Sequence, residues 1–204
     1  MGDRIRRLIF LLKNYYRVNK KYFVFITIIF FIAIMSGSIF TLTLNDTDTN
    51  IVSEFFSNYL ENINKINYIS SFVNSLISNI FVVMIIWLLS YSIIGLPIII
   101  LIFFYKSFII GFSISGIIIN YKIKGLLMAF LYIFPHQILF ILALLYLLVF
   151  SVIMSINLFY AVFKHENIRF SSNNNLIIIF ASIITLLCSI YDSFILPLIM
   201  KFMI

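Results

Sequence analysis

The stretch GLLMAFLYIFPHQILFILALLYLLVFSVIMSINLFYAVF, residues 125–163, contains 39 consecutive residues without an Asp, Glu, Lys or Arg. A single helix of that length would rise about 58 Å, whereas the hydrocarbon core of a bilayer is about 30 Å thick. Two full crossings would need about 40 residues and a turn. The stretch therefore predicts one element over about 126–160: a short apolar arm, a discontinuity at Pro135-His136, and one full spanning helix.

The discontinuity is the first candidate for a site. Irregular backbone at membrane depth is tolerated only where protein or a water-filled cavity satisfies the exposed amide groups. A neutral His136 that caps the break is favoured over a metal ligand, because no second His or Cys stands at ligand spacing. We therefore expect a structural role for Pro135 and His136.

Catalytic motifs are not visible elsewhere in the chain. There is no recognisable Ser-His-Asp set, paired carboxylates, phosphate-binding loop or His-Glu-x-x-His zinc motif. The lone Cys188 excludes a disulfide within the chain. The sequence thus predicts a protein that is not an enzyme, with no catalytic residues, no metal and no cofactor.

The composition of the whole chain agrees with a membrane location. Of 204 residues, 63 % are hydrophobic and 10 % are charged, whereas soluble domains carry about 25 % charged residues. The mean hydropathy is +1.15. We predict an all-α, polytopic integral membrane helical bundle that forms one transmembrane domain over residues 22–204. Its spans, about five, are expected at 22–44, 80–95, 97–119, 126–160 and 176–200.

Positive charge is concentrated at the N-terminus. Seven of the 14 Lys and Arg residues lie within the first 21 positions. The positive-inside rule therefore places this end in the cytoplasm. Residues 1–21 are predicted to form a basic amphipathic arm, with apolar positions at helical spacing. Because its charges adjoin a span, the expected partner is anionic lipid of the inner leaflet and not nucleic acid.

The topology of the middle of the chain has two interpretations. The segment Asn45–Asn79 is polar and acidic and is expected outside, with a short interfacial helix. In the preferred interpretation a second span ends near Ile94 and a third begins at Pro97, which suits proline early in a helix. Lys122 and Lys124 then lie outside, against the positive-inside rule. If residues 80–105 are one span, the lysines lie inside, but residues 107–119 remain a short re-entrant piece.

Two charged residues fall within predicted spans, Lys106 and Asp192. A charge inside a span usually faces protein or water, which makes both functional candidates. Snorkelling of the Lys106 side chain towards the interface is the alternative. Pairing between the two residues is left open.

Glycine and proline positions carry a resemblance to a known family. In order they are Gly95-Leu96-Pro97, Lys106, Gly111-Phe112, Gly116, Gly125 and Pro135-His136. The pattern resembles the stage II sporulation protein M family over most of the chain, most strongly between Gly95 and Gln137. The resemblance implies a membrane scaffold needed for forespore engulfment, located in the mother-cell membrane at the sporulation septum of an endospore-forming bacterium. It also implies two partners that degrade peptidoglycan, stage II sporulation proteins D and P.

A small multi-pass transporter or permease subunit is the alternative function. A broken helix together with Lys106 and Asp192 would then form the substrate path. Against this, five spans give no obvious inverted repeat. Small residues at Ser107, Gly111 and Ser115 instead indicate close helix packing, within one chain or in a homo-oligomer.

Overall fold

The computed structural model describes residues 2–62, 67–132, 134–165 and 174–203, and the regular elements within these ranges are all helices. In chain order they are α1 (Gly2–Val18), α2 (Lys20–Leu42), α3 (Asp46–Asn62), α4 (Tyr68–Leu89), α5 (Gly95–Tyr132), α6 (Phe134–Lys164), α7 (Asn174–Ile190), the π-helical turn η2 (Tyr191–Ile195) and α8 (Leu196–Met203). Five stretches of the described chain are long and apolar enough to cross a membrane. The predicted fold class, an all-α polytopic bundle, is confirmed.

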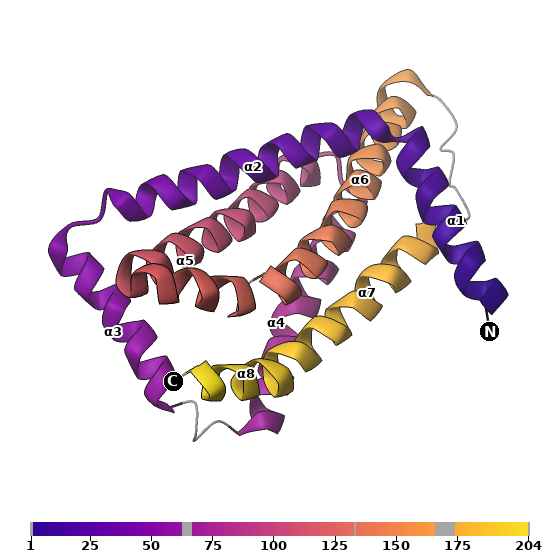
Figure 1. The fold of residues 1–204 in the computed structure, drawn as a ribbon. Helices are drawn as coiled ribbons and strands as arrows, with labels where there is room; N and C mark the ends of the chain where they lie inside the picture. Colours follow the sequence, from indigo (N-terminus) through magenta and orange to yellow (C-terminus); the bar gives the residue numbers. More distant parts are fainter. Residues whose placement is uncertain (1, 63–66, 133, 166–173, 204) are drawn as a thin grey trace.

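Helix α6 forms the centre of the bundle (Figure 1). It contacts α2, α4, α5 and α7. In its most apolar stretch of 18 residues, 67 % of the residues are buried, compared with 17 % in the corresponding stretch of α4. A helix surrounded by other helices has to be apolar on all sides, which explains why this part of the sequence carries no charge. The other spans turn broad apolar faces outward, as lipid contact requires.

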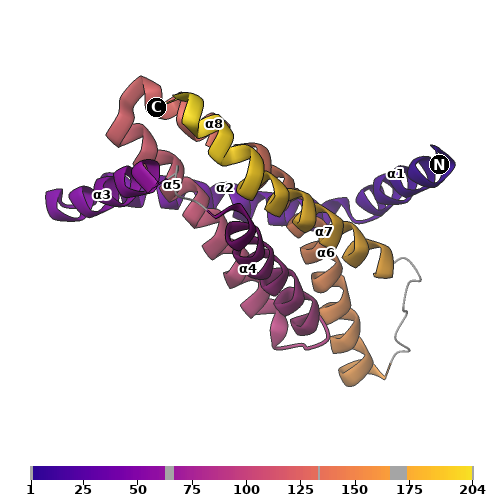
Figure 2. The ribbon, with the colours of Figure 1, turned by 90° about the horizontal axis from the view of Figure 1, so that it is seen from below.

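The two helices α1 and α3 project from opposite ends of α2 (Figures 1 and 2). The chain leaves helical geometry between α1 and α2 at Asn19, with φ −107° and ψ 21°. The described basic side chains of α1 are exposed, while α3 carries acidic residues and no basic one. Opposite charge therefore marks the two ends of the first span.

The second span begins earlier than the sequence suggested. It was expected at 80–95, but α4 runs from Tyr68 to Leu89. The side-chain oxygen of Asn67 caps this helix by accepting hydrogen bonds from the backbone N–H groups of Ile69 and Ser70. The first half of α4 is rich in Ser and Asn, which is typical of a loop. These residues are helical because α4 packs against α7 and η2, where polar side chains find protein partners.

Helix α5 replaces a predicted helix, loop and apolar arm. Its long limb ends at a reversal at Lys122, which has φ 50° and ψ −123°, and a short limb, residues 123–132, bends back (Figure 1). Gly125 permits the two limbs to approach, because a Cβ at this position would overlap the carbonyl oxygen of Ile117. The interval between the two spans expected at 97–119 and 126–160 is therefore a sharp bend within a helical element.

Pro135 and His136 lie at the start of α6, after the short limb of α5. Tyr132 ends α5, Phe134 begins α6, and residue 133 lies outside the described residues. Pro135 is thus the second residue of α6. Proline is well tolerated there because the first N–H groups of a helix have no partner within it.

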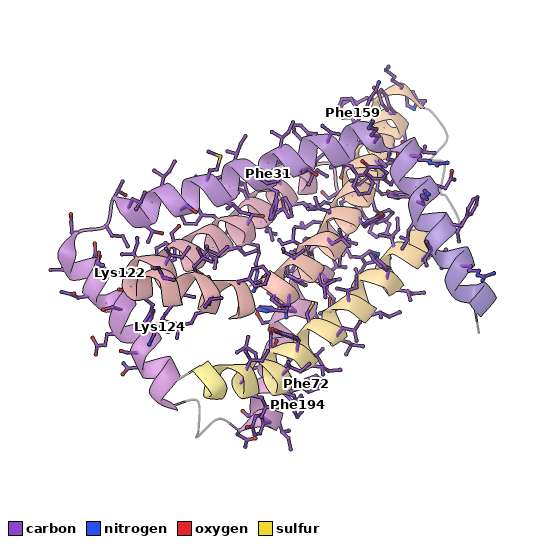
Figure 3. The ribbon with its side chains drawn as sticks, in the orientation of Figure 1. Phe31, Phe72, Lys122, Lys124, Phe159 and Phe194 are labelled. Atoms are coloured by element: carbon purple, nitrogen blue, oxygen red, sulfur yellow. The ribbon has the colours of Figure 1, made fainter. Side chains whose placement is uncertain are left out.

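The positions of Lys122 and Lys124 bear on the topology. Both side chains are exposed and lie on the side of α5 where α3 packs (Figure 3). If α1 is cytoplasmic, α3 and these lysines share the outer side. Their positive charge there faces an acidic helix, which offsets their conflict with the positive-inside rule.

Candidate functional site

Three polar side chains from different helices meet inside the bundle. The Ser75 hydroxyl of α4 donates a hydrogen bond of 2.9 Å to Oδ2 of Asp192 in η2. Nε2 of His136, near the start of α6, lies 3.1 Å from the other carboxylate oxygen, Oδ1. We call Ser75, His136 and Asp192 the polar junction. Both oxygens of one carboxylate therefore connect α4, α6 and the last span.

The π-helical turn positions Asp192. The backbone N–H of Leu196 bonds to the carbonyl of Tyr191, five residues earlier, which is the wider π-helical spacing. Pro197 follows directly. It has no N–H and its ring excludes the ordinary helical contact with the preceding turn, which gives a physical cause for the irregularity. The extra residue in this turn places Asp192 against α4 and α6.

The start of α6 is fixed by its contacts with the last span. His136 is 7 % exposed. Its ring stacks on Tyr191, with ring centroids 5.8 Å apart and planes inclined by 23°. Its backbone carbonyl accepts a hydrogen bond of 3.3 Å from Sγ of Cys188. Side chain and backbone of His136 are both engaged, so the residue orients the first turn of α6.

The polar contacts continue along α4. Nδ2 of Asn79 lies 3.4 Å from Oγ of Ser75, to which it donates. Ser75 stands seven residues after the first residue of α4, Tyr68, or about 10 Å along the helix axis. The polar junction therefore lies in the half of the bundle near α3 and the C-terminus.

The order of contacts in the polar junction decides its chemistry. In a Ser-His-Asp hydrolase the imidazole lies between serine and carboxylate and takes the hydroxyl proton. Here Asp192 lies in the middle, and the Ser75 hydroxyl donates to the carboxylate and not to the His136 ring. The His136 ring is therefore not placed to take the proton of Ser75, as the imidazole of such a hydrolase does. What the arrangement supplies is a polar connection between helices.

Within the described ranges, no three His, Cys, Asp or Glu side chains come close enough together to hold a metal ion. The His136–Asp192 pair alone gives two ligands, fewer than a protein metal site usually offers.

A second close contact joins α2 and α5. A Cβ on Gly37 would overlap the carbonyl oxygen of Phe108, and a Cβ on Gly111 would overlap that of Ile34. Ala33 and Ser107, four residues before each glycine, are fully buried. We call Ala33, Gly37, Ser107 and Gly111 the glycine seam. It is the close backbone approach that small residues four apart permit in membrane helices.

Hydroxyl groups reinforce the glycine seam. Oγ of Ser38 donates to the carbonyl of Gly111 at 3.2 Å, and Oγ1 of Thr41 lies 3.4 Å from the carbonyl oxygen of Phe112. In lipid no water competes for these carbonyl groups, so such bonds add to the packing. The stripe predicted from Ser107 and Gly111 thus meets the small residues of the first span.

The remaining predicted site residues lie elsewhere. Gly95 forms the tight turn between α4 and α5, since a Cβ would overlap the carbonyl oxygen of Leu89, and Pro97 is the third residue of α5. Gly116 is buried, and its carbonyl accepts a hydrogen bond of 2.9 Å from Asn120.

Lys106 is partly buried and forms no ion pair in the described part of the chain. The pairing left open between Lys106 and Asp192 is therefore absent; Asp192 contacts His136 and Ser75.

Sequence reasoning missed Ser75 of the polar junction and Asn79, which donates to it. They fall within the segment Asn45–Asn79, which was expected outside because it is polar and acidic as a whole. The signal that could have identified them is the four-residue spacing of Ser71, Ser75 and Asn79, which places polar groups on one helical face.

The chain was compared with known families, curated proteins and solved structures. The family model of stage II sporulation protein M matches residues 26–196. This range includes both the glycine seam and the polar junction, but not α1. No curated protein and no solved structure matches the chain.

Proposed function

The chain belongs to the stage II sporulation protein M family and is thus a multi-pass membrane protein of sporulation, and from this premise we propose that it is a non-catalytic scaffold. It acts in the mother-cell membrane at the sporulation septum. There it holds and localises two peptidoglycan-degrading partners, stage II sporulation proteins D and P, while the forespore is engulfed.

The proposal rests on one observation: the polar groups inside the membrane connect helices to each other. Asp192 is connected to α4 through Ser75 and to α6 through His136. Polar groups inside a membrane are costly and mark function by default. Here they join helices, as the glycine seam does for α2 and α5. A bundle joined in this way offers partners fixed surfaces, which is what a scaffold needs.

Helix α3 is the surface on which we expect partner contacts. It lies at the end of α2 opposite the basic α1 and therefore outside the cell if α1 is cytoplasmic (Figure 1). It exposes Asp48 and Glu54 together with the apolar Ile51. An exposed helix with both acidic and apolar groups suits a basic surface of an outward-facing domain.

Co-purification from sporulating cells tests the proposal. A tagged chain extracted in mild detergent should retain both hydrolases. The double charge reversal Asp48→Lys and Glu54→Lys should release them while the bundle stays intact. Conversion of two exposed cations of α1, Arg6→Glu and Arg17→Glu, is the matched control and should leave them bound. Without the protein the septum should form but engulfment should stop; hydrolases that localise unaided would contradict the scaffold.

The orientation of α3 can be measured separately. In a Cys188→Ser background, Asn50→Cys should react with an impermeant thiol reagent added to intact cells. Asn14→Cys, on α1, should react only after the cells are opened. Labelling of both positions from outside would show that the assumed topology is wrong.

A transporter remains the second candidate, because one observation favours it. The short limb of α5 bends back and ends just before α6 begins, and His136 near the start of α6 contacts Asp192. Discontinuous helices form transport sites in this way. Solute uptake into vesicles distinguishes the two functions. Uptake that is lost in both Lys106→Leu and Lys106→Glu, with the protein still inserted, would support the transporter.

A further inference from the structure

An apolar groove runs between α2 and α6 on the cytoplasmic half of the bundle. Its volume is about 490 Å³. Its walls are formed by Tyr16 of α1, by Phe23, Val24, Thr27, Ile28 and Phe31 of α2, and by Leu142, Leu145 and Tyr146 of α6. Several of these side chains are exposed, among them Val24, Ile28, Phe31 and Leu142. We call this feature the α2–α6 groove; it is open to the membrane along one side.

The dimensions of the groove match one leaflet. From Lys20 at the start of α2 to Phe31 is 11 residues, or about 16 Å along the helix, compared with about 15 Å for half of the hydrocarbon core. Figure 3 shows Phe31 near the middle of α2. The groove thus begins at the inner interface and ends near the bilayer centre.

The walls of the groove need no polar occupant. The Thr27 hydroxyl already donates to the carbonyl of Phe23 at 2.8 Å. The other side chains from α2 and α6 are aliphatic or aromatic. A hydrocarbon chain is therefore the chemistry that fits along its length.

The cytoplasmic end of the groove is different, because it carries cations. Lys20 precedes Val24 by four residues and Thr27 by seven, so it lies on the face of α2 that lines the groove. Lys13 precedes Tyr16 by three and shares its face of α1 in the same way. Both lysines are exposed, and in the described chain no carboxylate lies within salt-bridge distance of them.

An aromatic cluster holds α1 over this end. The ring of Tyr15 stacks on Tyr146 of α6, with centroids 6.4 Å apart, and meets Phe23 edge-on at 6.2 Å. Burial raises the pKa of the Tyr15 phenol well above its ordinary value, so no phenolate offsets the lysine charges. The position of the basic arm relative to the groove is therefore fixed by packing.

We propose that the α2–α6 groove is a binding site for one anionic phospholipid of the inner leaflet, with an acyl chain along α2 and the phosphate beside Lys20 and Lys13. A helix of another protein fits less well. It is about 10 Å wide with its side chains, and its apolar surface would leave the row of cations unmatched. The site does not depend on the scaffold function.

Native mass spectrometry of the full chain from nanodiscs tests the site. The discs contain phosphatidylglycerol and phosphatidylcholine in equal amounts. We expect one phosphatidylglycerol to be retained per chain in preference to phosphatidylcholine. Lys20→Gln should weaken retention about fivefold, the effect of one interfacial cation. Lys21→Gln, an equal loss of charge about a quarter turn away from the groove, should change retention less.

A second pair of variants tests the acyl chain. Val24→Trp fills the groove and should abolish retention, whereas Ile32→Trp places the same side chain at an exposed position outside it. If Val24→Trp does not fold, the lysine pair still decides. Equal retention in both lysine variants, no preference for phosphatidylglycerol, or crosslinks from the groove to another protein chain and not to lipid would each overturn the proposal.

Discussion

The glycine seam and the polar junction join helices of the same bundle by opposite means. At the seam, α2 and α5 approach so closely that a single Cβ on Gly37 or Gly111 would overlap a backbone carbonyl. At the junction, Asp192 accepts a hydrogen bond from Ser75 of α4 and lies 3.1 Å from Nε2 of His136 of α6. The seam depends on the absence of side-chain atoms, and the junction depends on particular ones.

This difference has a physical consequence. In a membrane the apolar tails compete with any apolar helix contact, so association requires either very close packing or polar bonds. The seam should therefore tolerate changes of polarity but not of volume. The junction should tolerate small changes of volume but not the loss of a donor or acceptor.

The largest effect is expected at the glycine seam. Gly111→Ala should lower stability by about 1–3 kcal/mol because the obstacle is backbone, which cannot rotate away. Gly111→Leu should be worse and should prevent accumulation of the folded protein. Thermal unfolding in mild detergent measures both. Leu101→Phe, which adds bulk at an exposed position of α5, should be close to neutral; equal losses in the two would mean that the seam is not close-packed.

The next effect is expected from the acid of the polar junction. Asp192→Leu removes the acceptor of Ser75 and the partner of His136, at a cost of about 1–3 kcal/mol. Asp192→Asn keeps the shape and one oxygen and should cost less. Melting temperatures of the two variants, compared with exposed Leu187→Ala, check this order. A stability of Asp192→Leu equal to that of the parent would reduce the junction to a coincidental contact.

Double mutants should then show whether the polar junction and the glycine seam contribute to stability independently. Ser75→Ala and Asp192→Leu each remove the hydrogen bond between the two residues, so a double-mutant cycle should give a coupling of about 0.5 kcal/mol or more. Ser75→Ala and Gly37→Ala share no partner and should add within about 0.5 kcal/mol. Strong coupling between the two regions would show that they act as one unit.

The smallest effect, and of opposite sign, is expected at the bend of α5. Lys122 has φ 50° and ψ −123°, a sparsely populated conformation that costs a non-glycine residue about 1–3 kcal/mol. Lys122→Gly should therefore stabilise the chain slightly. Lys124→Gly removes the same charge within a helix and should destabilise by about 0.5–1 kcal/mol. If both variants lose stability, the bend is not strained.

The fold and part of the site could be predicted because their signals are local. The charge-free stretch 125–163 predicted a short arm and a long spanning helix, and Ser107 with Gly111 indicated a packing stripe. The start of α4 was missed because Ser71 to Asn79 are polar, and only their contact with the last span makes them helical. His136 was expected to cap a break, but its ring lies against Asp192.

The sequence by itself determined that this chain is an all-α bundle with five spans, because hydropathy and length act along the chain, one segment at a time. It also determined the family. Only the tertiary structure decided which polar groups meet. Ser75, His136 and Asp192 are separated by at least 56 residues, and nothing local relates them. Their meeting depends on a π-helical turn and on how α4 and α6 pack, which are properties of the whole bundle.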